Sequence, residues 1–328
     1  MFAFTQPCAE RTVTIVRYII QRILQLVPVL FVVGTIIFFM FRVIPGDPAQ
    51  AILGLNTTPR ALASLRHEMG LDRPLSVQYI EWFGRVGRGD LGISRLEGQL
   101  PVGEILWNKT LHTLELVVTG VALALAAAVP LGVAAATAGG WTDQVIRVFA
   151  MLGFSTPSYW LAILLMLLFA AKLGWLPAGG FVPFAEKPLL HLRYLLLPAF
   201  TVAFIEAAAI VRFLRAGMLE VLNLNYIQTA RAKGLPRGVV IYKHALKNSM
   251  IPVITVLGMD VGGLVGGLVV TEQIFVWPGL GWQMVTSIGQ RDYEVVQGAV
   301  LFSALLFVAI NLAVDVLYAF LDPRIRYD

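Results

Sequence analysis

Long apolar runs separated by short polar segments make up most of the chain. Six of these runs are long enough to cross a bilayer, because a spanning helix needs roughly 20 mostly apolar residues. We expect the six spans near residues 18–42, 111–138, 145–171, 195–216, 250–275 and 298–320. The runs are continuous and do not alternate with polar residues, which argues against a membrane β-barrel. The pattern therefore predicts an all-α integral membrane protein with six transmembrane helices.

The composition agrees with this fold class. Of the 328 residues, 58% are hydrophobic and 14% are charged, whereas a soluble domain has about 25% charged residues. The net charge of +5 does not imply a nucleic-acid partner, because membrane proteins concentrate Lys and Arg in cytoplasmic loops. A single cysteine, Cys8, gives no internal disulfide. No metal site is expected, since the four histidines lie in different segments without metal-ligand spacing.

The basic residues orient the chain in the membrane. The N-terminus, the loop after the fourth span and the C-terminal tail are basic, which places both termini in the cytoplasm. The expected parts are a cytoplasmic extension (1–17), a first span (18–42), an external segment (43–110), a membrane core (111–320) with a cytoplasmic loop (217–249), and a cytoplasmic tail (321–328). The first apolar run exceeds the roughly 7–15 residues of a signal-peptide core and no cleavage site follows it, so we expect it to be retained.

The external segment has the composition of a soluble domain. Helical spacing of its apolar residues predicts short helices at 59–70 and 75–86. Four residues are expected to end the span before it: Pro45, Gly46, Asp47 and Pro48. Proline breaks a helix and disfavours helix in the residue before it. The segment is expected to form a small helical cap, which either closes the external end or receives a delivered ligand.

Glycines recur on the fifth span at positions 258, 262, 263, 266 and 267. Such residues let helix backbones approach closely in lipid, so we expect Gly262 and Gly266 to lie in a tight helix contact. The sequence contains neither the P-loop motif nor a dinucleotide-binding G-x-G-x-x-G after a strand, so the chain is not expected to bind ATP through a P-loop of its own. The zinc-protease motif H-E-x-x-H is also missing, and no motif supports an intramembrane enzyme.

Four acidic residues lie within or at the ends of the expected spans: Glu206, Asp260, Glu272 and Asp315. A charge in mid-membrane costs about 2.5–3.5 kcal/mol on insertion scales, so such residues usually face a cavity or a partner. Glu206 and Asp260 are the deepest. They are candidates to line a polar pathway and to meet a cationic group such as a substrate amine; alternatively each pairs with another helix, for example Glu206 with Arg212. For Glu272 and Asp315 we expect structural pairing.

A basic segment, Asn225–Pro252, interrupts the apolar C-terminal half of the chain. Its pattern predicts two short helices bent at Gly234-Leu235-Pro236, because glycine allows backbone conformations that other residues resist and proline suits the first turn of a helix. Before the bend, four residues at helical spacing predict one apolar face: Leu219, Leu222, Tyr226 and Ala230. Such a face can seat in a partner's groove while basic residues steer it. The alternative is a basic loop that anchors to lipid headgroups.

This segment resembles the EAA loop of ATP-binding-cassette (ABC) importer permeases, in which a short coupling helix docks on an ATPase subunit. The corresponding positions are Gln228-Thr229-Ala230, then Gly234, then Leu246. The first two triplet positions depart from the general pattern. The form TARAKG followed by HALKN instead resembles the dipeptide/oligopeptide/nickel branch of that superfamily.

Further motifs of that branch occur from about Val16 to the end of the chain. They are IPGDP (44–48), GLDRP (70–74), GDLGIS (89–94), TEQIFVWPGLG (271–281), RDYEVVQ (291–297) and DPRIR (322–326). The branch has RDYP more often than RDYE, so Glu294 is a departure. The first fifteen or so residues extend beyond the usual start.

The resemblance implies the type I ABC importer permease fold, with both termini inside, in a bacterial inner membrane. It implies import of di- or oligopeptides with a second permease, two ATPases and an external substrate-binding protein as partners. ATP and Mg²⁺ would bind the ATPases, and this chain would hold no cofactor. Nickel, glutathione or oligosaccharide are substrates elsewhere in the family. The alternative from another class is an ion-driven secondary transporter that uses Glu206 and Asp260.

The resemblance also suggests roles for particular residues. Those expected to couple to the ATPase are Tyr226, Ala230, Arg231, Lys233, Gly234, Leu235, His244 and Asn248. Of these, Ala230 and Gly234 would allow close approach, while Arg231 and Lys233 would make polar contacts. Structural roles are expected for Pro45, Gly46, Asp47, Pro48, Gly262, Gly266, Glu272, Pro278, Gly279 and Asp315.

Overall fold

The computed structural model describes residues 8–43, 47–54 and 57–321. These residues fall into two compact units: unit 1 lies within 1–113, 278–312 and 326–328, and unit 2 within 114–277 and 313–325. Two residues with predicted structural roles, Pro45 and Gly46, lie outside the described residues, as do the side chains of Pro48 and Asp315.

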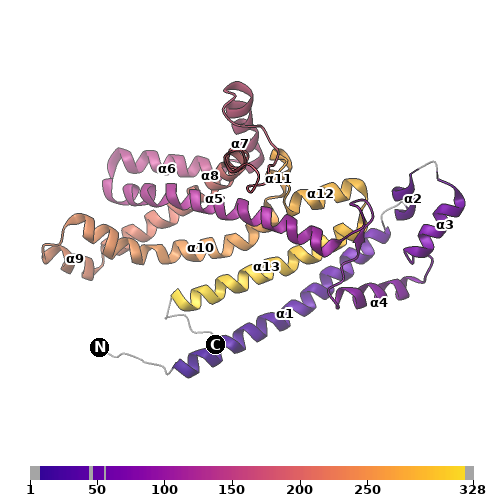
Figure 1. Cartoon of the computed structure of the whole chain (residues 1–328). Coiled ribbons are helices and arrows are strands. Elements are labelled where there is room, and N and C mark those ends of the chain that lie inside the picture. The colour runs from indigo at the N-terminus through magenta and orange to yellow at the C-terminus, as the bar shows by residue number, and fades with distance from the viewer. Residues whose placement is uncertain (1–7, 44–46, 55–56, 322–328) are drawn as a thin grey trace. The chain divides into compact units, whose positions relative to one another are not determined.

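Four helices precede one small hairpin in the described part of the chain up to residue 101, and Figure 1 labels the helices. The elements in order are α1 (Cys8–Val43), α2 (Pro48–Leu53), α3 (Pro59–Glu68), α4 (Leu75–Val86), β1 (Ile93–Ser94) and β2 (Leu100–Pro101). The two strands are antiparallel, with Ile93 opposite Pro101. The two predicted external helices are confirmed as α3 and α4. The helix of the first span ends at Val43, just before the motif predicted to stop it.

Helices also make up most of the remaining chain. They are α5 (Val102–Ala138), α6 (Gly140–Ser155), α7 (Ser158–Leu165), the π-helical η1 (Met166–Lys172), α8 (Pro188–Leu222), α9 (Asn225–Ala232), the π-helical η2 (Val239–Ala245), α10 (Leu246–Gly267), α11 (Val269–Phe275), α12 (Leu280–Gln290) and α13 (Tyr293–Leu321). α12 was not predicted. Its sequence follows the motif TEQIFVWPGLG, whose Pro278 and Gly279 precede the helix, and Gly279 occupies its N-cap.

Five stretches of helix are long and apolar enough to cross a membrane, and a bent pair would make a sixth span. The five are Leu24–Val43, Val102–Ala138, Pro188–Leu222, Val239–Gly267 and Tyr293–Val314. The pair is α6 with the helix that runs from Ser158 to Lys172, and the bend between them is 104°. Six spans are therefore confirmed if the bent pair counts as one.

The prediction of one continuous span at 145–171 is wrong. The helix stops at Ser155, Thr156 takes an extended conformation, and Pro157 forms the N-cap of α7. Proline disfavours helix in the residue before it, which explains the break. The span predicted at 250–275 is also interrupted, because α10 ends at Gly267 and α11 begins at Val269.

In unit 2, α8 packs against both α6 and α10 and supplies much of the buried core. Small residues bring the helices together. A Cβ added at Gly120 of α5 would lie 2.7 Å from Val202, one at Gly132 would lie 2.8 Å from Leu214, and one at Gly153 of α6 would lie 2.7 Å from Ala208. Close approach through glycine therefore organises the helix contacts of this unit.

The glycines of the fifth span behave differently from the prediction. Gly262 is buried, but a Cβ added at Gly263, Gly266 or Gly267 would have no heavy atom within 4 Å among the described residues. The expected tight contact at Gly266 is therefore not made within this chain. In this unit the glycines that allow close approach include Gly120 and Gly132 on α5, Gly153 on α6 and Gly217 on α8, where an added Cβ would lie 3.2 Å from Ser249 O of α10.

Unit 1 has an aromatic core between α1 and α4. Phe38 is fully buried and lies against Tyr79, with ring centroids 5.1 Å apart, and against Trp82 at 5.7 Å. Thr35 and Tyr79 share a hydrogen bond of 2.8 Å. The spacing of Tyr79, Trp82 and Phe83 predicted an apolar face on this helix, and the structure shows that this face of α4 packs on α1.

Candidate functional site

The predicted bend at Gly234 is confirmed, and it ends α9. The amide of Gly234 donates to Arg231 O (2.9 Å) and the amide of Leu235 donates to Ala230 O (3.3 Å). This pair of bonds is the Schellman arrangement, which places its C′ residue in the left-handed region. Gly234 fills that position with φ +75°, a conformation that costs other residues about 1–2 kcal/mol. The chain then turns at Pro236, whose carbonyl accepts the amide of Val240.

Three of the predicted coupling residues come together across this turn. The Asn248 amide nitrogen donates to the Tyr226 hydroxyl at 2.6 Å, and the Tyr226 hydroxyl lies 3.4 Å from the carbonyl oxygen of His244. Tyr226 belongs to α9, His244 to η2 and Asn248 to α10. The hydroxyl therefore joins the short helix to the start of the next membrane helix.

Two details of the predicted coupling face are wrong. Leu219 and Leu222 belong to α8, and the chain leaves the helix at Asn223 before α9 begins, so the four apolar residues do not share one helix. Ala230 is only 8% exposed and packs into the core of unit 2 with Ile227. Ala230 thus seats α9 on its own chain and is not free to meet a partner. The predicted second short helix is the first part of the Val239–Gly267 helix.

Most basic residues of this segment, by contrast, are exposed. Arg231, Lys233, Lys243 and Lys247 are exposed, and none of them forms an ion pair with a described residue. Arg237 donates to the carbonyl oxygen of Thr137 at 2.9 Å, which ties the segment to the end of α5. A cavity of about 490 Å³ lies beside this contact. It is lined by Ala136, Thr137, Leu222, Arg231, Leu235, Arg237, Val240 and Ile241.

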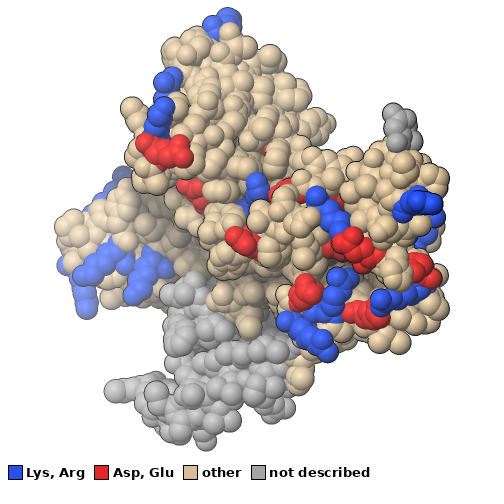
Figure 2. All heavy atoms as spheres, turned by 45° about the vertical axis from the view of Figure 1, so that its right-hand side comes forward, with Lys and Arg blue, Asp and Glu red and all other residues tan. Residues whose placement is uncertain are grey.

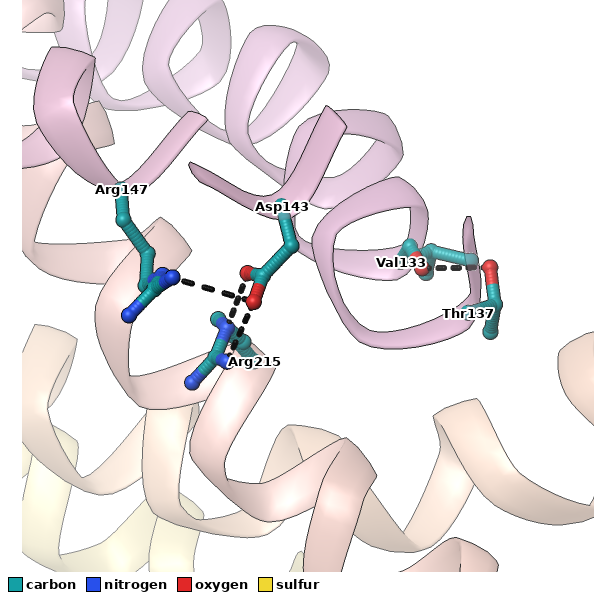
Figure 3. A network of polar contacts seen from close by, with 5 residues as sticks. All are labelled: Val133, Thr137, Asp143, Arg147 and Arg215. Carbon is teal, nitrogen blue, oxygen red and sulfur yellow. Dashed lines mark hydrogen bonds and ion pairs between the residues drawn. The ribbon is translucent and has the colours of Figure 1, made fainter. Parts of the chain in front are cut away.

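An ion pair that the sequence analysis missed holds α6 against α8 (Figure 3). Arg215 donates from Nε and from a terminal nitrogen to the two carboxylate oxygens of Asp143, at 2.5 and 2.7 Å, and Arg147 lies 3.4 Å from the same carboxylate. Asp143 lies in the first turn of α6, where an acid is favoured by the helix dipole. That local signal is present in the sequence, but nothing in it identifies Arg215, 72 residues away, as the partner.

The structure brings together the two predicted pathway residues. Glu206 on α8 is 8% exposed, Asp260 on α10 is exposed, and the two are close enough for their charges to interact. The suggested pairing of Glu206 with Arg212 is wrong, because the Arg212 guanidinium lies over the rings of Phe154 (4.7 Å) and Phe213 (5.1 Å). Glu272, predicted to be structural, is fully buried.

A second polar network, also not predicted, joins the β-hairpin to the start of α13 in unit 1. The Ser94 hydroxyl donates to Asp292 at 2.5 Å, and the amide of Ile93 donates to Glu294 at 2.7 Å. Ser94 and Asp292 are buried, and burial raises the pKa of the Asp292 carboxyl above its usual range. Glu294, the departure from the family motif, thus has a defined contact. In the same unit Asp47 caps α2 and forms an ion pair with Arg66.

Acidic and histidine side chains do not gather into a metal site in the described part of the chain. His191, for example, contacts Glu115 at 2.7 Å and the carbonyl oxygen of Val182 at 2.8 Å, which uses both of its ring nitrogens.

Comparison with known proteins agrees with this architecture. Residues 128–327 match the family described as binding-protein-dependent transport system inner membrane component, and residues 15–102 match its N-terminal family. A putative peptide transport system permease protein of Brucella abortus is 42% identical over 311 residues, which are 94% of this chain and 99% of the relative. A dipeptide transport system permease protein of Alkalihalophilus pseudofirmus is 40% identical, with 94% and 99% covered.

A glutathione transport system permease protein of Salmonella typhi is also 40% identical, over 94% of this chain and 99% of its own. Among solved structures, an amino acid ABC transporter described as crystallised with histidines aligns with a TM-score of 0.50 at 14% identity, over 68% of this chain and 94% of its own. At that identity the likeness concerns the fold alone.

The chain belongs to the binding-protein-dependent transport system inner membrane components. It is a multi-pass membrane protein with the type I ABC importer permease fold, of the branch whose members include peptide permeases. It is therefore a transporter subunit that works with other ABC components.

Proposed function

We propose that the chain is the permease subunit of a bacterial inner-membrane importer for di- or oligopeptides. It forms half of the translocation pathway beside a second, related permease. Two cytoplasmic ATPases bind ATP and Mg²⁺ and drive the cycle, an external binding protein delivers the substrate, and this chain holds no cofactor. The relatives named as peptide and dipeptide permeases support the peptide assignment.

The observation that carries the proposal is the segment from Asn225 to Asn248. It presents exposed, unpaired cations beside a Schellman turn at Gly234, while Tyr226 fixes α9 to the base of a membrane helix. Motion of a partner bound at α9 would reach α10 through that contact. In this proposal Arg231 and Lys233 meet the ATPase, together with the exposed Leu235.

Gly234→Val tests the coupling. A β-branched residue is strained at φ +75°, so the turn should open and the Leu235 to Ala230 bond should be lost. We expect peptide uptake by the assembled importer to fall by more than about tenfold. The strain of about 1–2 kcal/mol by itself lowers the population of the turn conformation by about that factor. The membrane helices should stay folded, as judged by the yield of intact complex.

Gly238→Val is the matched control. Gly238 is also exposed in this segment, but its φ is −61° and no heavy atom lies within 4 Å of an added Cβ. Uptake should be retained in this variant. Equal activity of the two variants would contradict the assignment of Gly234 to coupling.

Glu206 and Asp260 are proposed to line the pathway and to meet the amino group of the peptide. Their position on facing parts of α8 and α10, with Asp260 exposed, supports this role. Asp260→Asn should weaken uptake of a dipeptide more than uptake of the same dipeptide with an acetylated amino group. An equal loss of uptake for both peptides would show that Asp260 does not contact the amino group of the peptide.

Glutathione remains a second candidate substrate because of the 40% identical relatives that bear that name. Competition between labelled dipeptide and glutathione for the assembled importer distinguishes the two, since only the true substrate should block uptake at low concentration.

A further inference from the structure

Unit 1 contains a cavity that the proposed transport cycle does not use. Its volume is about 670 Å³, within the range of roughly 300–1,000 Å³ typical of small-molecule pockets. The walls come from the end of α1, the loop before α4, α4 itself, the β-hairpin and the first turn of α13. Figure 2 shows basic and acidic side chains gathered on the surface of the external segment, around this part of the unit.

The charge in the cavity is unbalanced. Five arginines line it against three glutamates; the arginines are Arg42, Arg73, Arg85, Arg88 and Arg95. Two of them are neutralised by ion pairs, Arg73 with Glu81 at 2.6 Å and Arg95 with Glu68 at 2.9 Å. The other three form no ion pair with a described residue; they are Arg42 on α1, Arg85 on α4 and Arg88 just after α4. Glu294, the third acid, accepts a hydrogen bond from the amide of Ile93 and lies near enough to Arg85 and Arg95 for their charges to interact, so the cavity keeps a net positive charge.

Two arginine nitrogens are left without a partner in the folded chain. The Nε atoms of Arg42 and Arg95 are buried and have no hydrogen-bond acceptor. The terminal nitrogens of Arg42 donate to Phe38 O and to Gln78, each at 2.9 Å, so this side chain is held in place. Because these two atoms are buried, they do not face a ligand. The exposed guanidinium groups of Arg85 and Arg88 in the same cavity do, and phosphate matches the planar fork of arginine.

The position of the cavity relative to the apolar stretches indicates which phosphate-bearing molecule it would bind. Arg42 lies in the last turn of α1, at the end of the apolar stretch Leu24–Val43, and Tyr293 and Glu294 begin the apolar stretch Tyr293–Val314. Both ends mark the boundary between hydrocarbon and headgroups. Phe41, Trp82 and Tyr293 also line the cavity, and Trp and Tyr favour this level of a membrane.

Apolar surface lies next to the cations. Val43 is 81% exposed and Met40 45% exposed on the last turns of α1, and Ile80, which lines the cavity, is 69% exposed. Acyl chains would cover such residues below a bound headgroup. A soluble acidic protein would meet arginines from outside, but it would not cover side chains at hydrocarbon depth.

We propose that this cavity binds the phosphate-bearing headgroup of an anionic phospholipid from the external leaflet, with its acyl chains along α1. Arg85 and Arg88, which are exposed, would contact the phosphate, and Arg42 adds positive charge to the wall of the same cavity. The site would hold the external segment to the membrane surface.

The test compares Arg85→Gln/Arg88→Gln with Arg60→Gln in the complete importer. Arg60 is an exposed arginine of α3 outside the cavity. Each complex is purified from discs containing equal parts of phosphatidylglycerol and phosphatidylcholine, and the retained lipid is counted by native mass spectrometry. We expect selective retention of phosphatidylglycerol by the parent and by Arg60→Gln, and roughly tenfold less in the double variant, since charged hydrogen bonds contribute about 1.5–3 kcal/mol.

Four outcomes would overturn the proposal. Retention of the two lipids in equal amounts would show that the site does not select an anionic lipid. An equal loss of phosphatidylglycerol in the Arg60→Gln control would show that the loss does not depend on the cavity arginines. Glycerol 3-phosphate that binds the delipidated importer as tightly as phosphatidylglycerol would make the site one for soluble phosphates. Unchanged lipid retention in the double variant, with weakened binding of the external binding protein, would assign the arginines to that protein.

Discussion

Two polar segments interrupt the apolar chain: the basic segment 225–248, which we propose to be cytoplasmic, and the segment 47–101, which we propose to be external. Most charges are paired within the chain in the second segment, whereas the cations of the first form no ion pair with a described residue. In the external segment most charges are paired within the chain: Asp47 with Arg66, Glu68 with Arg95 and Glu81 with Arg73. In the cytoplasmic segment the exposed cations find no acid among the described residues. The external segment therefore satisfies most of its charges within the chain, whereas the cytoplasmic segment keeps exposed cations, which the proposed function assigns to contacts with an ATPase.

The two regions are also held in place by different kinds of interaction, in line with this difference in charge pairing. The external hairpin is fastened by buried carboxylates, while α9 is fastened by apolar burial of Ile227 and by a neutral hydrogen bond through Tyr226. A surface that must bind and release a partner keeps its charges free. Arg85 and Arg88 are among the arginines of the external segment without an ion pair to a described residue, and they line the cavity assigned to a phospholipid.

The largest effect is expected where a carboxylate is buried. Asp292→Ala should lower the free energy of unfolding by about 2–3 kcal/mol, because the Ser94 hydroxyl and the Val295 amide lose their acceptor in a buried site. Thermal unfolding of the detergent-purified protein measures the loss. Asp72→Ala is the control: Asp72 pairs with His67 at the surface, so the melting temperature should hardly change. Similar losses in both variants would mean that burial of the hairpin network does not matter.

The same carboxyl predicts a pH dependence. Burial raises the pKa of the Asp292 carboxyl in the folded protein. The protonated carboxyl therefore contributes its full share to the free energy of unfolding below its ordinary pKa of about 4. That contribution is lost as the pH rises through the raised pKa, because the unfolded chain releases the proton more readily. Asp292→Asn does not titrate and should flatten that part of the profile. A parent and a variant with parallel stability profiles from pH 4 to 8 would refute this sign.

A smaller effect is expected at the support of the cytoplasmic segment. Arg215→Gln breaks both hydrogen bonds to Asp143 and should cost about 1–2 kcal/mol, since the pair is only partly exposed. Arg147→Gln removes one longer contact to the same carboxylate and should cost clearly less. Melting temperatures of the two variants check the order, and a reversed order would show that Arg215 is not the principal partner.

The smallest change is Tyr226→Phe, which removes the hydroxyl that joins α9 to Asn248 and His244. We expect a loss of about 0.5–1 kcal/mol in local stability, because neutral hydrogen bonds of partly exposed groups contribute little. Hydrogen exchange of the α9 amides should accelerate several-fold. Tyr242→Phe is the matched control, since Tyr242 is 62% exposed. Unaltered hydrogen exchange in Tyr226→Phe would show that the hydroxyl does not couple α9 to α10.

Much of the fold follows from local pattern. The apolar runs locate the spans, and α3, α4 and the turn at Gly234 lie where spacing and turn chemistry predict them. Errors arise where local rules compete. Apolar content favours one span through residues 145–171, but Pro157 breaks it; helical spacing joins Leu219 to Ala230, but the chain leaves the helix at Asn223.

Of the candidate site, the sequence predicted the turn at Gly234 and identified Glu206 and Asp260 as acids on two membrane helices, which the structure brings near one another. It did not show that Ala230 is turned inward, or that Arg212 prefers aromatic rings to Glu206. Both outcomes depend on which helices neighbour one another. Periodicity identifies an apolar face but not what covers it.

The sequence by itself determined that this protein lies in a membrane, that it has a basic segment on one side, and that Gly234 bends that segment. These features depend on the transfer of apolar side chains to lipid and on backbone preferences of single residues, both of which are local. Tertiary structure alone decided which charges are paired and which stay free. Ser94 meets Asp292 across 198 residues, and Arg215 meets Asp143 across 72. Such pairs form only after the helices have packed, so no pattern along the chain encodes them.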